Sequence, residues 1–119
     1  MNLKYLCLLY EDGERIDALP ARESEFIAAE NREYLGELER SGHAITAARL
    51  QPAETATTIR VRDGSVFISN GTAEARERLG AFYLIDARDL NDAIRIAAKM
   101  PRARLGFIDV RPLEECDPG

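Results

Sequence analysis

The hydrophobic and polar positions of this chain follow two periods, one typical of strands and one typical of helices. Residues 3–10 form an almost continuous apolar run, which predicts a strand that is apolar on both faces. Residues 79–86 repeat this pattern. Further strands are expected over residues 43–50, 57–62, 65–69 and 105–111.

Two stretches carry the spacing of amphipathic helices. The first runs from about Pro20, which suits a first helical turn, to Ser41, with Gly42 ending it. Its buried stripe is expected to contain Ile27, Asn31, Tyr34 and Leu38, widened by Phe26 and Leu35. The second helix is capped by Asp89, has Asp92 in its first turn and stops before Pro101. Its expected buried stripe is Leu90, Ala93, Ile94 and Ala97.

The order of these elements predicts the fold class. Residues 11–19 read as a loop, and Asp63-Gly64 reads as a tight turn between two alternating strands. The order is then β-α-β, a hairpin, and β-α-β, which is typical of an α+β, ferredoxin-like split βαβ sheet. Residues 1–119 are expected to form a single domain with an acidic tail from about residue 112.

In a monomer, one apolar face of the predicted sheet would remain uncovered. Two helices can cover only one face, yet the strands at 3–10 and 79–86 are apolar on both. A bare apolar patch of that size is rare on a soluble monomer. We therefore expect a homodimer through the open sheet face, with the two sheets closing into a dimeric α+β barrel.

Charge and targeting signals narrow the choice of partners. The formal net charge is -5, which disfavours nucleic acid and anionic membrane surfaces as partners. The apolar run at 3–10 is too short to span a bilayer, and Glu11-Asp12-Gly13-Glu14 follows it where a signal peptide would be cleaved, so a cytoplasmic protein is expected. Cys7 and Cys116 are expected to be free thiols, with Cys7 buried and inert.

Several segments, taken together and in order, resemble the YCII-related domains and in particular their DGPF-type branch. They are Ser41-Gly42-His43, Leu50-Gln51-Pro52, residues 56–64, residues 73–80, Phe82-Tyr83-Leu84-Ile85, residues 87–94 and Val110-Arg111-Pro112. The resemblance implies a dimeric α+β barrel whose activity is mostly undetermined. Some members are thought to hold a His and an Asp facing a cleft, one relative dehydrochlorinates a chlorinated aromatic, and others accompany alternative sigma factors.

The chain departs from the branch at its signature. The usual Asp-Gly-Pro-Phe is replaced by Asn70-Gly71-Thr72, one residue shorter and without the carboxylate. Asn70 could hydrogen-bond a ligand but cannot act as a general base, and as part of Asn-Gly it also reads as a turn residue. Glu74 could supply the missing carboxylate, or be a solvated charge.

His43 is the only histidine, so any imidazole chemistry must use it. Its place after a helix-ending glycine would let the ring line a cleft and transfer protons, although an ordinary surface or interface histidine fits as well. Arg49, at the end of a strand, could clamp an anionic ligand or make a surface salt bridge. One histidine and two distant cysteines give no zinc set, and no motif indicates a cofactor.

Two hypotheses follow from these residues. The first is a small-molecule site in a cleft near His43 and loop 70–78, with cofactor-independent acid/base chemistry by His43 and Glu74 and ligand contacts from Asn70 and Arg49. The second is a non-catalytic module that binds a ligand or a regulatory partner. An enclosed, partly polar pocket touching His43 would favour the first.

Overall fold

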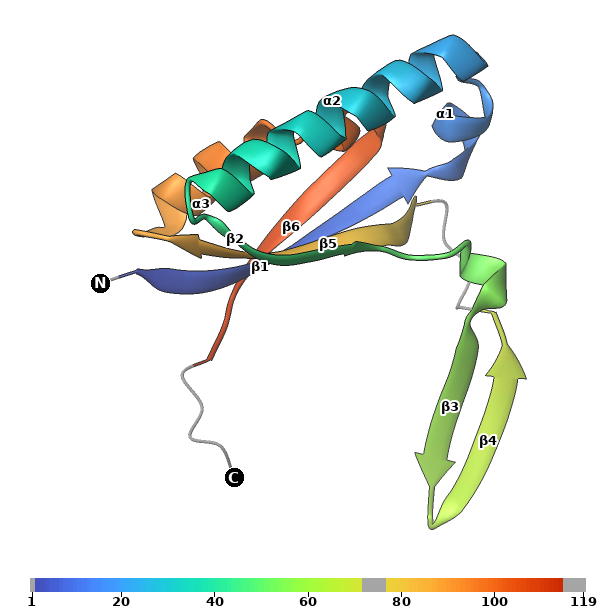
Figure 1. Ribbon diagram of the computed structural model, residues 1–119. Coiled ribbons are helices and arrows are strands. Elements are labelled where there is room, and N and C mark those ends of the chain that lie inside the picture. Colours follow the sequence, from blue (N-terminus) through green and yellow to red (C-terminus); the bar gives the residue numbers. More distant parts are fainter. Residues whose placement is uncertain (1, 72–76, 115–119) are drawn as a thin grey trace.

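A four-stranded antiparallel sheet forms the centre of the fold, which the computed structural model describes for residues 2–71 and 77–114 (Figure 1). The strand order is β2-β5-β1-β6. The bounds of these strands are Leu3–Asp12 for β1, Ala44–Arg49 for β2, Glu77–Ala87 for β5 and Gly106–Pro112 for β6. The predicted α+β class is confirmed.

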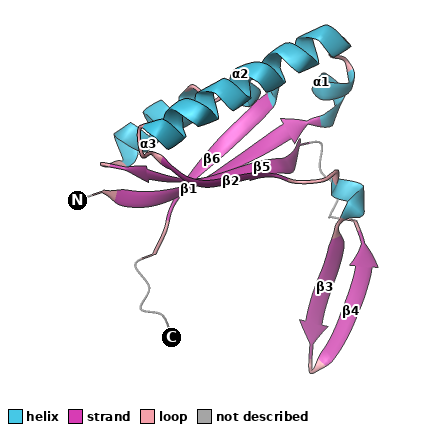
Figure 2. Cartoon of the chain, in the orientation of Figure 1, coloured by secondary structure: helices cyan, strands magenta, loops and turns pink. Residues whose placement is uncertain are grey.

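The helices and a hairpin lie on opposite sides of this sheet. Helices α2 (Ala21–Arg40) and α3 (Leu90–Ala98) cover one face, and strands β3 (Thr57–Arg62) and β4 (Ser65–Asn70) form a separate hairpin that extends away on the other side (Figures 1 and 2). The predicted turn is confirmed, because Asp63 and Gly64 both have positive φ. The short helix α1 (Gly13–Asp17) and the 3-10 turns η1 (Ala53–Thr55) and η2 (Pro101–Leu105) complete the described elements.

The core lies between the sheet and the helices. Alternate residues of β1 and β5 point into it, and Cys7, Leu9 and Ile85 are completely buried there. Burial raises the pKa of the Cys7 thiol to about 11, so the thiol stays protonated at neutral pH. The prediction that Cys7 is a buried, free thiol is confirmed.

The predicted buried stripes are wrong in part. Leu90 and Ile94 are about half exposed, whereas α3 buries Asp92, Ala93, Ile96 and Ala97. In a helix of nine residues, neighbouring stripes fit the apolar pattern almost equally, and polar contacts decide between them. Asp92 is drawn inward because it accepts hydrogen bonds from the Arg88 backbone and the Arg95 guanidinium. Phe26 is 65% exposed, near the end of α2 that extends beyond the sheet (Figure 1).

The predicted loop over residues 11–19 is also wrong. Strand β1 continues to Asp12, whose carboxylate accepts a hydrogen bond from the Glu14 backbone N–H at 3.0 Å and caps α1. Strand β5 likewise starts two residues earlier than predicted, at Glu77. These extensions carry β1 and β5 past the core to one end of the sheet.

Replacing Asp92 by Asn is expected to destabilise the protein more at neutral pH than at acid pH. The hydrogen bonds from the Arg88 backbone and the Arg95 guanidinium hold the pKa of the Asp92 carboxyl well below its usual range. The ionised carboxylate therefore contributes stability that is present above the unfolded-state value of about 4 and is lost as the pH falls through the lower folded-state value.

Urea denaturation of the wild type and Asp92→Asn from about pH 6 to about pH 2 tests this expectation. The difference between their midpoints should narrow as the pH falls. A difference that stays constant across this range would contradict a role for the carboxylate charge.

Candidate functional site

Glu11 is a charged residue at a position of β1 where the alternation of buried and exposed residues predicts a buried apolar side chain. It continues the buried face of β1 after Tyr5, Cys7 and Leu9, and only 8% of its side chain is exposed. Its Oε1 atom pairs with Arg49 Nη1 at 3.1 Å and with Arg102 Nε at 3.3 Å. Two guanidinium groups, one from β2 and one from η2, therefore hold this carboxylate at the end of the sheet.

A glycine in β5 makes room for the Glu11 side chain. Gly80 is the extra residue of a bulge in β5, where the pairing passes from Leu9–Ala81 to Tyr10–Leu79. A Cβ on Gly80 would lie 2.7 Å from both Cδ and Oε1 of Glu11. Gly106 pairs with Glu11 on the other side, in β6. The carboxylate thus occupies space that any larger residue at position 80 would fill.

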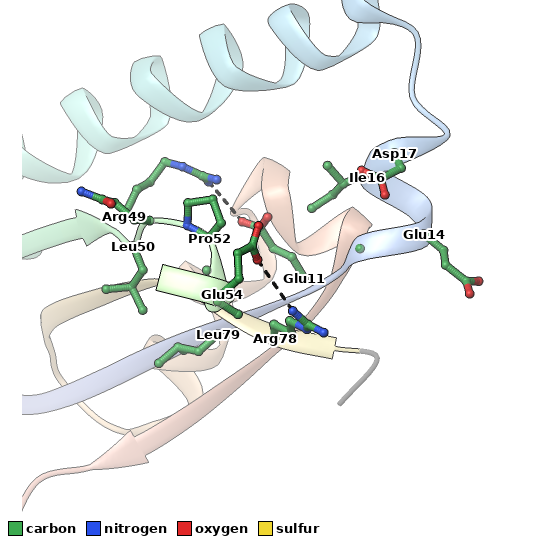
Figure 3. Close-up of a pocket in the computed structure, with 14 residues that line it drawn as sticks. Glu11, Glu14, Ile16, Asp17, Arg49, Leu50, Pro52, Glu54, Arg78 and Leu79 are labelled. Atoms are coloured by element: carbon green, nitrogen blue, oxygen red, sulfur yellow. Dashed lines mark hydrogen bonds and ion pairs between the residues drawn. The ribbon is translucent and has the colours of Figure 1, made fainter. Parts of the chain in front are cut away.

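A cavity of about 900 Å³ opens beside this carboxylate (Figure 3). Its walls come from the end of β1, from α1, from the segment that joins β2 to η1, and from the start of β5. The charged lining residues are Glu11, Glu14, Asp17, Arg49, Glu54 and Arg78. A volume of this size is typical of small-molecule sites.

The charges are distributed unevenly around the cavity. Arg49, with half of its side chain exposed, lies across the cavity from Asp17 of α1 (Figure 3). Glu54 pairs with Arg78 at 3.9 Å along a third wall. A bound molecule would therefore meet a guanidinium group on one side and a carboxylate on the other.

The structure separates the predicted site residues. Arg49 lines the cavity, and Asn70 pairs with Thr57 at the base of the hairpin. His43 precedes β2 and lies at the opposite end of that strand from Arg49, about 20 Å away for six residues of extended chain. Glu74, Thr72 and Cys116 lie outside the described residues.

His43 has a defined partner at its own end of the sheet. Its Nδ1 atom lies 2.9 Å from the backbone carbonyl oxygen of Asp86, and the Asp86 N–H donates to the His43 carbonyl at 2.7 Å. Since a carbonyl oxygen can only accept, Nδ1 donates, and in the neutral ring Nε2 is the proton acceptor. His43 is not among the residues that line the cavity beside Glu11.

Sequence reasoning missed Glu11 and Arg102. The sequence did contain a signal for Glu11. Side chains alternate between the two faces of a strand, so residue 11 points to the same face as the buried residues 5, 7 and 9. An acidic residue in phase with a buried strand face requires a cationic partner. Arg102 has no comparable signal, since it lies 91 residues away in a 3-10 turn.

The described part of the chain contains neither a metal-binding cluster nor a membrane-spanning helix. Among residues 2–71 and 77–114, no three His, Cys, Asp or Glu side chains are grouped as a metal ion would require. No helix in these ranges combines the length and apolar character needed to cross a membrane.

The fold and the site define a small α+β protein with a charged cavity at one end of its sheet. The chain belongs to the YCII-related domain family, whose model matches residues 3–117. It is also 33% identical over 122 residues to an uncharacterized protein, R00369, of Rhizobium meliloti (strain 1021). That match covers 97% of this chain and 95% of the relative, so the two proteins correspond almost end to end.

Proposed function

We propose that the cavity beside Glu11 binds a small zwitterionic organic molecule. The observation that carries this proposal is the nearly buried Glu11 carboxylate, which two arginines hold against a cavity of about 900 Å³. A burial of this kind costs free energy unless the groups are paired and positioned. Arg49 would bind an acidic group of the ligand, and the Asp17 carboxylate of α1 would bind a protonated amine.

A matched set of ligands tests this charge pattern. Calorimetric titration would compare a free amino acid, the amine formally obtained by removing its carboxyl group, and the acid obtained by removing its amino group. The zwitterion should bind best, because only it can pair both with the Arg49 guanidinium and with the carboxylate on the opposite wall of the cavity. If none of the three, across several side-chain sizes, binds saturably, the proposal is wrong.

Arg49→Ala is expected to weaken binding of the zwitterion at least about tenfold, because a hydrogen bond to a charged group is lost. The affinity for the amine alone should fall less, since the amine pairs only with the carboxylate on the opposite wall. Arg22→Ala, an exposed arginine on α2, is the control and should bind as the wild type does. Equal loss for the zwitterion and the amine would contradict the assigned role of Arg49.

We also propose that the chain forms the homodimer expected from its sequence. The support is the face of the sheet opposite the helices, where Leu6, Leu8, Phe82 and Leu84 are only partly buried and Phe107 is 43% exposed. The strand order, with β5 between β2 and β1, also fits the split βαβ sheet of a dimeric barrel. Light scattering at micromolar concentration should give twice the protomer mass, and a monomer would contradict the dimer.

A second candidate function, acid/base chemistry at His43, has one observation in its favour. The hydrogen bond from Nδ1 to the Asp86 carbonyl orients the ring and leaves Nε2 as the proton acceptor. We propose that the chain is of the DGPF type that its sequence resembles. Asn70 then stands in place of the signature aspartate, and Glu74 would be the other acid or base. His43→Gln should then abolish turnover without changing the affinity of the Glu11 cavity, and unchanged turnover would contradict this chemistry.

A further inference from the structure

The hairpin of β3 and β4 has one apolar face and one polar face. The register pairs Ile59 with Ile68 and Val61 with Val66, so these four aliphatic side chains share one face. The other face carries mostly polar residues, namely Thr58, Arg60, Arg62, Ser65, Phe67 and Ser69. This alternation is typical of strands that pack on one side and face water on the other.

The apolar face of the hairpin is uncovered in the protomer. Each of its four aliphatic side chains is between 56% and 67% exposed, namely Ile59, Val61, Val66 and Ile68. Together they present roughly 400 Å² of apolar surface, which is as much as the largest patch on many monomers. A two-stranded hairpin is also only marginally stable by itself in water. The hairpin therefore needs a surface to pack against.

The shape of the chain also shows how far the hairpin extends. The radius of gyration is 16.4 Å, whereas a compact domain of this length has about 13.5 Å. Hydrogen bonds from Gly71 N–H to the Ala56 carbonyl and from the Thr58 hydroxyl to the Gly71 carbonyl close the base of the hairpin. From this base it extends away from its own sheet, on the side that α2 and α3 leave open (Figures 1 and 2).

We propose that this hairpin is a dimer arm, whose apolar face, formed by Ile59, Val61, Val66 and Ile68, packs against a second copy of the chain. The proposal rests on the homodimer through the open sheet face proposed above. In that dimer, the arm of each protomer projects toward the side on which its partner lies. The direction of the arm and the position of the open face therefore both indicate a second copy of the chain as the binding partner.

The areas also fit a second copy. A stable interface of standard size buries about 800 Å² on each partner. The apolar face of the arm supplies about half of this area. The sheet face that α2 and α3 leave open lies on the side to which the arm extends (Figure 1). The apolar face of the arm alone therefore falls short of a standard interface, and the open sheet face of the same protomer is the surface that extends it.

The first test is the dissociation constant of the dimer, measured by sedimentation equilibrium. Val61→Lys/Ile68→Lys places two charges on the apolar face of the arm and should raise the dissociation constant at least about 100-fold. Ser65→Lys/Ser69→Lys adds the same charges to the polar face of the same hairpin and should change it less than about threefold. Circular dichroism of both variants checks that each remains folded.

The second test identifies the surface that the arm contacts. A photo-reactive side chain at position 61, in a mixture of isotope-labelled and unlabelled full-length chains, should form crosslinks between chains. The same group at position 62, on the polar face, should form few.

The outcomes separate this proposal from the one on which it rests. A dimer that tolerates the Val61→Lys/Ile68→Lys change and gives no interchain crosslink from position 61 would overturn the arm and leave the dimer intact. Crosslinks only within one chain would show that the arm folds onto its own sheet, which also overturns it. A wild type that is monomeric throughout would overturn both proposals.

Discussion

Glu11→Ala is expected to lower the free energy of unfolding by about 3 kcal/mol, because it leaves two guanidinium groups facing each other without their shared carboxylate. Arg102 is the more affected, with only 12% of its side chain exposed and its Nε atom 3.3 Å from Glu11 Oε1. Arg49 is half exposed and can turn toward water, which places the loss near the lower limit for a broken buried ion pair.

Urea denaturation at neutral pH measures this loss, and Glu54→Ala is the matched control. Glu54 lines the same cavity and pairs with Arg78, but 75% of its side chain is exposed. Its removal should cost less than about 0.5 kcal/mol. If the two variants are equally stable, Glu11 does not hold the arginines in the way described. The zwitterion should also fail to bind Glu11→Ala, because Arg49 loses its fixed position.

Gly106→Ala is expected to lower the free energy of unfolding by about 3 kcal/mol or more, because the added methyl group has no space. A Cβ on Gly106 would overlap the carbonyl oxygen of Tyr10 in the neighbouring strand. Backbone atoms cannot turn aside as a side chain can, so β1 and β6 would have to separate. The rings of Tyr10 and Phe107, stacked 4.9 Å apart across the same two strands, would separate with them.

The control for this substitution is Gly13→Ala, since a Cβ on Gly13 meets no atom within 4 Å. Gly13 begins α1, so the change should be neutral or slightly stabilising. Thermal and urea denaturation of both variants provide the comparison. A Gly106→Ala protein as stable as the wild type would mean that β1 and β6 can move apart at little cost.

The elements of the fold were predictable where a pattern extends over many residues. The helix expected from Pro20 to Ser41 is α2, with Pro20 and Ser41 as its caps, and Gly42 has the positive φ expected of a helix-ending glycine. Prediction was wrong where the pattern is short. The nine residues of α3 fit more than one buried stripe, and the five residues of α1 carry almost no periodic signal.

The candidate site was predictable only in part. Arg49 was selected as a ligand-binding residue, and it lines the cavity. His43 was expected to share a cleft with loop 70–78, and within the described residues it lies at the other end of β2 from the hairpin base. Position along the chain gave no information on which end of the sheet each residue would occupy.

The sequence by itself determined the order of the strands and of α2 and α3, the strands that are apolar on both faces, the alternating hairpin and membership of the family. These properties depend on local periodicity and on residues read in order. Only the tertiary structure decided that Glu11 meets Arg49 and Arg102, and that a cavity opens beside them. That contact joins residues up to 91 positions apart and depends on a one-residue bulge at Gly80. Register and bulges are set by the packing of the whole sheet, so no local pattern encodes where such distant side chains meet.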